Sequence, residues 1–166
     1  MELLIREVQP DDAEAIVDII NPIIEAGNYT AFDTLFTVET EREYILHFPQ
    51  RGVFNVATCC QKQKIVGFQS MEPFATYTHA FDHVGVLGTY VSLCERRQGI
   101  GKSLFKATFE AARRKGYEKL LTFIRADNQA ALATYLNQGF QIIGTAQRQA
   151  RINGKYVDEI IIERFL

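Results

Sequence analysis

Apolar residues recur along the chain at two spacings, and the change between the spacings divides the sequence into helices and strands. Ile16, Ile19, Ile20, Ile23 and Ile24 keep the three-to-four-residue spacing of a helix with one buried face. Residues 53–93 instead carry short runs of valine, isoleucine and phenylalanine separated by polar turns, which is typical of strands. The pattern therefore predicts an α/β protein with an antiparallel-looking centre.

The predicted elements follow the order β-α-α-β-β-β-α-β-α-β-β. The strands are expected at residues 3–8, 53–60, 65–71, 83–93 and 120–124 and in a hairpin of 141–151 with 156–163 about Asn153-Gly154, and the helices at 11–26, 37–47, 99–115 and 128–138. We expect Asp11 to cap the first helix with Glu14 reaching back, and Asn21-Pro22 to kink or restart it. With 166 residues and no internal repeat or linker, residues 1–166 are expected to form a single domain.

Composition narrows the class of protein. The chain is 47% hydrophobic and 23% charged, with a net charge of -2, which argues against a general nucleic-acid or anionic-membrane binder. No apolar run reaches the ~20 residues of a membrane helix, and the N-terminus lacks a secretory signal, so we expect a cytoplasmic protein. Cys59, Cys60 and Cys94 form an odd set without metal-ligand spacing, and buried, reduced thiols are expected.

The charge is unevenly distributed. Residues 1–50 hold eleven acidic and two basic residues, whereas residues 96–119 hold eight basic and two acidic residues. An anionic ligand would favour the second stretch, and the acidic region could draw in a cationic one. Two solvated helix faces would give the same imbalance, so the charge alone does not decide between these interpretations.

A strand that leads through a glycine-containing turn into a helix predicts an anion site at residues 91–103. Gly99 and Gly101 let backbone N–H groups approach a ligand, and the helix N-terminus adds unpaired donors and a positive dipole end. The triphosphate-loop motif is excluded because Arg96 stands where it needs glycine. The dinucleotide fingerprint is excluded because Leu104 stands where it needs a small residue, and a plain turn is the remaining alternative.

Two stretches resemble the signatures of the GNAT superfamily of N-acetyltransferases. Arg96-Arg97-Gln98-Gly99-Ile100-Gly101 resembles its Arg/Gln-x-x-Gly-x-Gly/Ala loop, and residues 128–140 resemble its Asn-x-x-Ala-x-x-x-Tyr-x-x-x-Gly-Phe stretch. Residues 21–32 followed by Thr37-Val38-Glu39 are similar to the phosphinothricin and L-amino-acid N-acyltransferase subgroup. The resemblance implies a mixed, mostly antiparallel sheet of about seven strands flanked by four helices and splayed between strands 4 and 5.

The resemblance also implies a reaction. Such enzymes transfer an acetyl group from acetyl-CoA to an amine by direct attack through a tetrahedral intermediate, and here the acceptor would be a small amine, an amino acid or an amino-acid-like compound. No metal is expected, and a homodimer is allowed. Tyr135 is the expected proton donor to the leaving thiolate. The residues expected to bind acetyl-CoA are Val91, Ser92, Leu93, Arg96, Arg97, Gln98, Gly99, Ile100, Gly101, Lys102, Ser103, Asn128 and Tyr135.

The base that deprotonates the amine is not identified by the resemblance. The subgroup has a glutamate four positions before a Tyr-Val pair, and counting back from Tyr90-Val91 gives Val86, which cannot accept a proton. The substitutes are Glu72 and His83, with His79 and Asp82 as weaker candidates.

Two other functions stay open from the sequence. One is an acetyltransferase that acts on protein N-termini or lysines, and the other is an acyl-CoA-binding module that has lost turnover. Tyr29, Phe32, Phe36 and Phe74 are candidates for lining the acceptor pocket, although aromatic side chains mostly fill cores.

Overall fold

The computed structural model describes residues 1–166, and its helices and strands follow the predicted order. The strands are β1 (Leu3–Glu7), β2 (Val53–Cys59), β3 (Lys64–Pro73), β4 (Val84–Val91), β5 (Lys119–Arg125), β6 (Gln141–Ile152) and β7 (Lys155–Phe165), and the helices are α1 (Ala13–Ala26), α2 (Val38–Leu46), α3 (Ile100–Arg114) and α4 (Gln129–Asn137). Two short 3-10 turns, Pro10–Asp12 and Leu93–Glu95, were not predicted.

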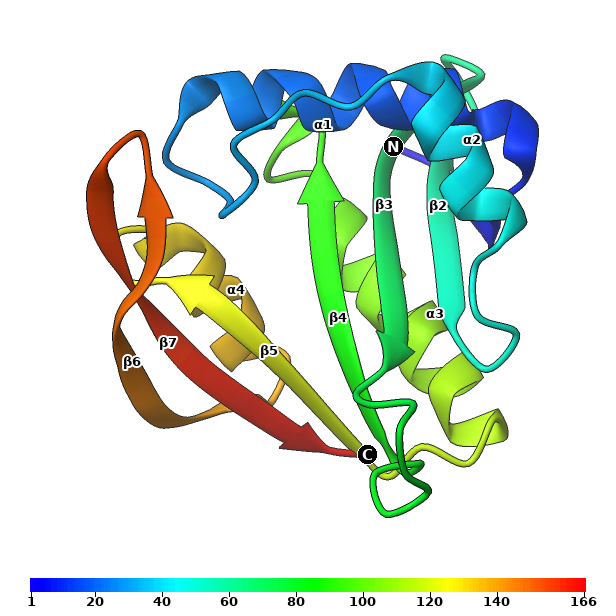
Figure 1. The fold of residues 1–166 in the computed structure, drawn as a ribbon. Helices are drawn as coiled ribbons and strands as arrows, with labels where there is room; N and C mark the ends of the chain where they lie inside the picture. The colour runs from blue at the N-terminus through cyan, green and yellow to red at the C-terminus, as the bar shows by residue number, and fades with distance from the viewer.

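The seven strands form one mixed sheet in the order β1-β2-β3-β4-β5-β7-β6. Every neighbouring pair is antiparallel except β4 and β5, which are parallel. β4 and β5 lie together at one end and diverge toward the other (Figure 1). The predicted fold, a mostly antiparallel sheet splayed between strands 4 and 5, is therefore confirmed.

Helices cover both faces of the sheet and divide the core into layers. On one face α1 and α2 pack on β2 and β3 through a cluster that includes Ile16, Ile20, Phe54 and Phe68. On the other face α3 and α4 pack on β3, β4, β5 and β7 through a cluster that includes Phe105. The predicted apolar face of α3 is buried as expected, because Leu104, Phe105, Thr108, Phe109 and Ala112 all point into the protein.

Most helix and strand ends occur where local sequence signals placed them. Thr37 caps α2, and Asn128 caps α4 by accepting a hydrogen bond from the Ala131 amide. Gly116 and Gly139 follow helices with φ of +87° and +84°. Asn153 and Gly154 both have positive φ, as a two-residue hairpin turn of the mirror-image type requires.

Two predictions about α1 are wrong. Asp11 does not cap the helix; Asp12 is the N-cap residue, and its carboxylate accepts hydrogen bonds from Arg6 and from the Gln9 amide. The helix also runs through Pro22 as one element, so the expected restart there is wrong. Next to that proline, the Asn21 side chain bonds both backbone groups of Phe36, so tertiary contacts hold the turn that lacks one N–H donor.

The prediction of buried thiols holds for one cysteine of three. Cys59 is buried, whereas Cys60 and Cys94 are exposed. Cys60 lies just beyond the end of β2, and the alternation of side chains along a strand turns it away from the face that buries Cys59.

Candidate active site

The gap between β4 and β5 exposes the backbone of β4. The two strands pair only from Val84 to Val86, and the Thr122 hydroxyl then donates to the Leu87 carbonyl in place of the next ladder bond. The Ser92 amide bonds back to Val66 on β3, so alternation turns the backbone groups of Thr89 and Val91 toward the gap. A strand edge with free N–H and C=O groups is left there, inside the sheet.

Tyr135 reaches this edge from α4. Its hydroxyl lies 2.8 Å from the Thr89 hydroxyl, which accepts a hydrogen bond of 2.7 Å from the Gln69 amide. Either hydroxyl can donate across the Thr89–Tyr135 contact, and when Thr89 donates, the Tyr135 proton is free for a third group. Burial raises the pKa of Tyr135, opposed by the hydrogen bond from Thr89, so this tyrosine is a neutral hydrogen-bond donor at neutral pH.

The turn between β4 and α3 has the backbone shape of an anion cradle. Arg97 and Gly99 have φ of +61° and +79°, and no side chain caps the N-terminus of α3. A Cβ on Gly101 would meet no atom within 4 Å, so the space over this first turn is open to a ligand. The first turn of α3 contains no acidic residue, and Arg96, Arg97 and Lys102 are exposed around it. These features fit the diphosphate of coenzyme A.

Glu95 fastens this turn to the sheet, a role that sequence reasoning missed. Its carboxylate is 3% exposed and receives hydrogen bonds from Lys62 at 2.6 Å and from Gln98 at 3.1 Å, with Lys64 at 3.3 Å. The hydrogen bond from Lys62 is the largest of the causes that lower its pKa. Gln98, one of the predicted cofactor residues, therefore also anchors the turn through this carboxylate.

Glu72 lies directly beside Val86, the position where the subgroup has a glutamate. The turn before α3, residues 96–101, is called the cofactor turn below, and α3 packs on the other face of the sheet from Glu72. In the antiparallel ladder, Glu72 of β3 pairs with Val86 of β4, so the two side chains are cross-strand neighbours on one face. The Tyr44 hydroxyl from α2 lies next to Glu72. Burial, then the charge of Glu72 and a hydrogen bond to it, raise the pKa of Tyr44.

A second carboxylate, Glu41, faces the same region and was not a candidate from the sequence. Glu41 is only 4% exposed, and its carboxylate has no hydrogen-bond or ion-pair partner. Burial raises its pKa to about 7, and its charge in turn raises the pKa of Tyr44, which lies one helical turn further along α2. The sequence does not single out Glu41, because it stands between Glu39 and Glu43 in a polar stretch. Only the fold shows that Glu41 is buried while these two neighbours are exposed.

The loop between α1 and α2 joins the acceptor side to the cofactor turn. Arg125 donates to the carbonyls of Gly27 and Thr30, and the guanidinium of Arg96 lies 4.1 Å from the ring centre of Tyr29. Asn128, a predicted cofactor residue, donates to the Tyr29 carbonyl while it caps α4. Its amide therefore holds the loop and the helix start.

Other candidates for the base lie elsewhere. His83 is exposed just before β4, at the end of the strand opposite to Tyr90 and Val91. His79 and Asp82 form an exposed pair at 2.9 Å in the turn before it. The structure thus brings Glu72 toward Tyr44 but does not bring these three residues to Thr89 and Tyr135.

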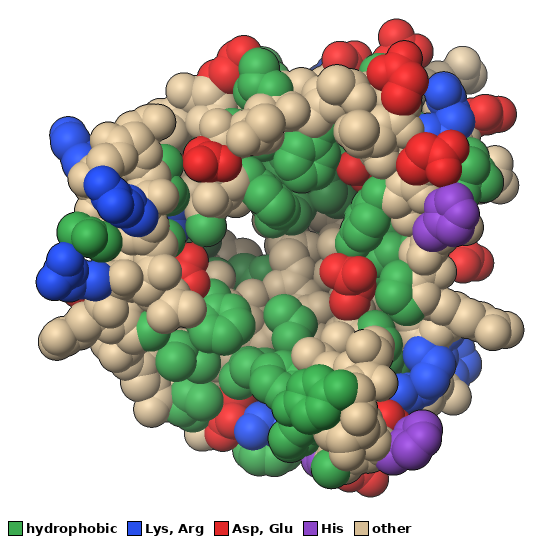
Figure 2. Space-filling model, viewed as in Figure 1, with side chains coloured by type: hydrophobic (Ala, Val, Ile, Leu, Met, Phe, Trp, Pro, Cys, Tyr) green, Lys and Arg blue, Asp and Glu red, His purple; other side chains and the backbone are tan.

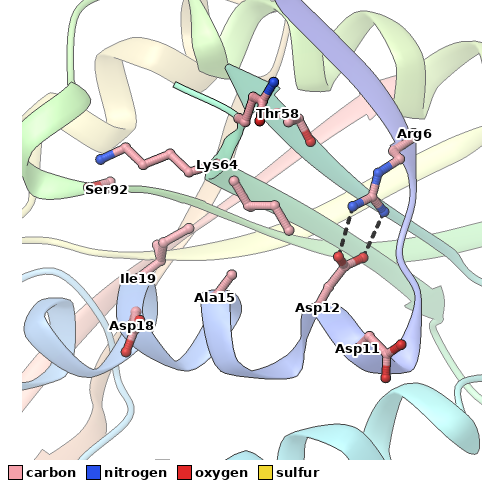
Figure 3. A pocket seen from close by; sticks show the side chains of 11 residues that line it. Arg6, Asp11, Asp12, Ala15, Asp18, Ile19, Thr58, Lys64 and Ser92 are labelled. Carbon is pink, nitrogen blue, oxygen red and sulfur yellow. Dashed lines mark hydrogen bonds and ion pairs between the residues drawn. The ribbon is translucent and has the colours of Figure 1, made fainter. Parts of the chain in front are cut away.

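Figure 2 shows a hollow at the centre of the molecule, between the elements that diverge in Figure 1. Its walls are largely apolar, with acidic side chains along its margin, and most of the Lys and Arg side chains lie toward the outer edges. Another cavity of about 470 Å³ lies between α1 and the turn that joins β2 to β3, where the Arg6–Asp12 ion pair lies on one side (Figure 3). Ser92, one of the residues expected to bind acetyl-CoA, also lines it. It contains none of the candidate catalytic residues.

Two further observations concern metal sites and membrane spans. No cluster of three or more His, Cys, Asp or Glu side chains is arranged to hold a metal ion. None of the helices combines the length and the apolar composition of a membrane span.

Known proteins that are similar to nearly the whole of this chain are N-acetyltransferases. Phosphinothricin N-acetyltransferase of Streptomyces coelicolor is 27% identical, with 98% of this chain and 96% of that protein covered. The crystal structure of ribosomal-protein-alanine N-acetyltransferase from Brucella melitensis has a TM-score of 0.90 at 27% identity, covering 98% of this chain and 99% of that one.

A phosphinothricin acetyltransferase from Sinorhizobium meliloti, in complex with AcCoA, has a TM-score of 0.90 at 19% identity, which supports the fold alone; it covers 100% of this chain and 89% of that one. Residues 18–140 match the acetyltransferase (GNAT) family, and this match contains the glycine turn, the splayed strands and Tyr135. The chain belongs to the GNAT family of acetyltransferases.

Proposed function

We propose that this enzyme transfers an acetyl group from acetyl-CoA to the primary amine of a small molecule by direct attack, without an acyl-enzyme. The observation that carries the proposal is the convergence of three features on the gap between β4 and β5. These are the open helix N-terminus at Gly101, the free backbone of Thr89 and Val91, and the Tyr135 hydroxyl.

On the donor side the protein binds and aligns the thioester. Backbone N–H groups of the cofactor turn hold the diphosphate, and Arg96, Arg97 and Lys102 add positive charge. Free N–H groups on β4 are suited to the acetyl oxygen, where negative charge develops as the amine attacks. Holding the two reactants together removes association entropy from the chemical step.

On the acceptor side Glu72 is the proposed base. An alkylammonium with an ordinary pKa of about 10.4 must lose a proton before its nitrogen can attack. Glu72 accepts that proton, directly or through water, from a position beside Val86 on the neighbouring strand. The free amine then bonds to the acetyl carbon.

Tyr135 completes the reaction at the sulfur. As the new C–N bond forms and the C–S bond breaks, the Tyr135 hydroxyl donates a hydrogen bond to the departing thiolate, and the attacking nitrogen loses its second proton to water on the acceptor side. A tyrosine pKa near 10 already exceeds a thiol pKa of about 8.5, and burial raises that of Tyr135 further. Tyr135 therefore stabilises the thiolate first as a hydrogen-bond donor, and the uphill proton transfer is completed as coenzyme A leaves and Tyr135 regains a proton from water.

The proposal is tested by thiol release from acetyl-CoA over a panel of small amines, with Tyr135→Phe and Tyr117→Phe compared. Tyr135→Phe should lower turnover by roughly 10²-fold while acetyl-CoA affinity stays nearly the same. Tyr117 is also buried, but its hydroxyl bonds to Arg51, so Tyr117→Phe should leave turnover near the parent value.

An undiminished rate in Tyr135→Phe would remove that residue from the mechanism. Acetyl-CoA binding without thiol release from any amine would favour a non-catalytic acyl-CoA-binding module instead. The name of the Brucella melitensis relative makes a protein N-terminus the second acceptor to test, with alanine-starting peptides in the same assay.

A further inference from the structure

We propose, building on the acetyl-transfer function above, that the acceptor is a primary amine that binds as a cation and carries no carboxylate. It would be an alkylamine or arylalkylamine rather than an amino acid. The proposal stands on two carboxylates, a set of aromatic side chains and the contacts that hold four basic side chains elsewhere.

The acidic pair consists of Glu41 on α2 and Glu72 on β3. Glu41 lies one helical turn before Tyr44, whose ring packs on Phe54 of the sheet, and both carboxylates raise the pKa of Tyr44. Glu41 is 4% exposed and unpartnered, although a buried charge normally requires a partner. The fully enclosed side-chain oxygens without partners are those of Thr58 and Gln69 only, so the Glu41 oxygens still face an open space. A ligand ammonium in that space would supply the missing partner.

Basic side chains around the region are bound elsewhere. Arg125 pairs with Asp127 and the loop carbonyls, and Arg96 stacks on Tyr29 at the cofactor turn. Lys62 and Lys64 are held by Glu95. No basic residue contributes to the shifted pKa values of Glu41, Tyr44, Tyr90 or Tyr135. A carboxylate on the acceptor would therefore meet two like charges and none of these four cations.

Aromatic rings provide a surface for the body of such an amine. Tyr90 stacks on Phe68 at 5.0 Å between ring centres, and Phe32 from the α1–α2 loop lies 6.3 Å from Tyr90. Phe32 in turn meets Phe36 edge-to-face at 5.1 Å. Rings of this kind favour both an apolar chain and an ammonium ion over their faces.

The first experiment uses matched acceptor pairs that differ only by the α-carboxylate. Thiol release is measured with 2-phenylethylamine against phenylalanine, and with 3-methylbutylamine against leucine, at saturating acetyl-CoA and pH 8. We expect kcat/KM to favour each amine by at least about tenfold. Equal or better use of the amino acids would overturn the inference while leaving the acetyltransferase function in place.

The second experiment measures binding and does not depend on turnover. Calorimetry with 2-phenylethylamine in the presence of coenzyme A should detect binding to the parent protein, and Glu41→Gln should weaken it by about tenfold or more. Glu39→Gln, on the exposed face of the same helix, is the matched control and should bind like the parent.

The outcomes separate the two proposals. Amine binding without thiol release would support the inference and refute the proposed function. If neither amine binds, or if Glu41→Gln binds as tightly as the parent, the inference is wrong whatever the protein does with acetyl-CoA.

Discussion

Burial of Glu41 without a partner makes the folded protein hold a proton that the unfolded chain releases at lower pH. The pKa of this carboxyl is raised from 4.5 to about 7 on folding, and burial is the cause. No charged group opposes the effect of burial on this pKa. Stability from this proton is fully present below pH 4.5 and is lost as the pH rises through 7.

We therefore predict that Glu41→Gln becomes more stable relative to the parent as the pH rises from 5 to 8. The difference in the free energy of unfolding should grow by on the order of 1–3 kcal/mol, with solvent screening setting the lower end. Urea unfolding at four pH values measures it, with Glu39→Gln as the control. Curves for Glu41→Gln and the parent that stay parallel over this range would contradict the prediction.

Thr89 is the second residue whose role can be measured alone, because it links Gln69 to Tyr135. Thr89→Val keeps the shape of the side chain but removes the hydroxyl, leaving the buried Gln69 amide without its acceptor. We expect a loss of about 1–3 kcal/mol in stability and a fall in kcat, with acetyl-CoA affinity unchanged. Thr89→Ser restores the hydroxyl and should recover kcat; a Ser variant as slow as the Val variant would exclude the relay.

At the scale of elements, the turn that precedes α3 depends on a contact with the β2–β3 turn. The Glu95 carboxylate binds Lys62 in that turn and Lys64 at the start of β3, and it also accepts a hydrogen bond from Gln98 beside Gly99. Glu95→Gln weakens this tie, so we predict a several-fold weaker affinity for coenzyme A, measured by calorimetry, with a smaller change in kcat. Glu110→Gln, on the exposed face of α3, is the control. Equal affinities in the two variants would show that the turn holds its shape without Glu95.

The elements and the backbone shape of the turn before α3 could be predicted because their signals are local. Asn128, Gly139 and the Gly99–Gly101 turn are short patterns that fix caps and backbone angles within a few residues. Glu41 and Glu95 could not be predicted, because their burial depends on residues far away in the sequence. The same reason explains α1, where a contact from Asn21 to the backbone of Phe36 carries the helix past Pro22.

At the scale of the whole molecule, the sheet is divided at the gap where we propose that the donor binds. β4 and β5 share only three residue pairs, so β1–β4 and β5–β7 are joined at one end and apart at the other. A molecule bound in the gap contacts the native state alone and stabilises it by mass action. Acetyl-CoA at a hundred times its Kd should add about 2.7 kcal/mol and raise the melting temperature by roughly 5–10 °C.

A single substitution in the cofactor turn should separate this effect from stability itself. Gly101→Asp places a carboxylate in open space at a helix N-terminus that holds no acid, which favours the folded protein but repels a diphosphate. We predict a melting temperature at least equal to that of the parent without ligand, and no rise with acetyl-CoA. Gly144→Asp, also in open space but on β6, should keep the full rise. A normal rise in Gly101→Asp would mean that the donor binds elsewhere, because no charge-independent contact could hold a diphosphate against that carboxylate.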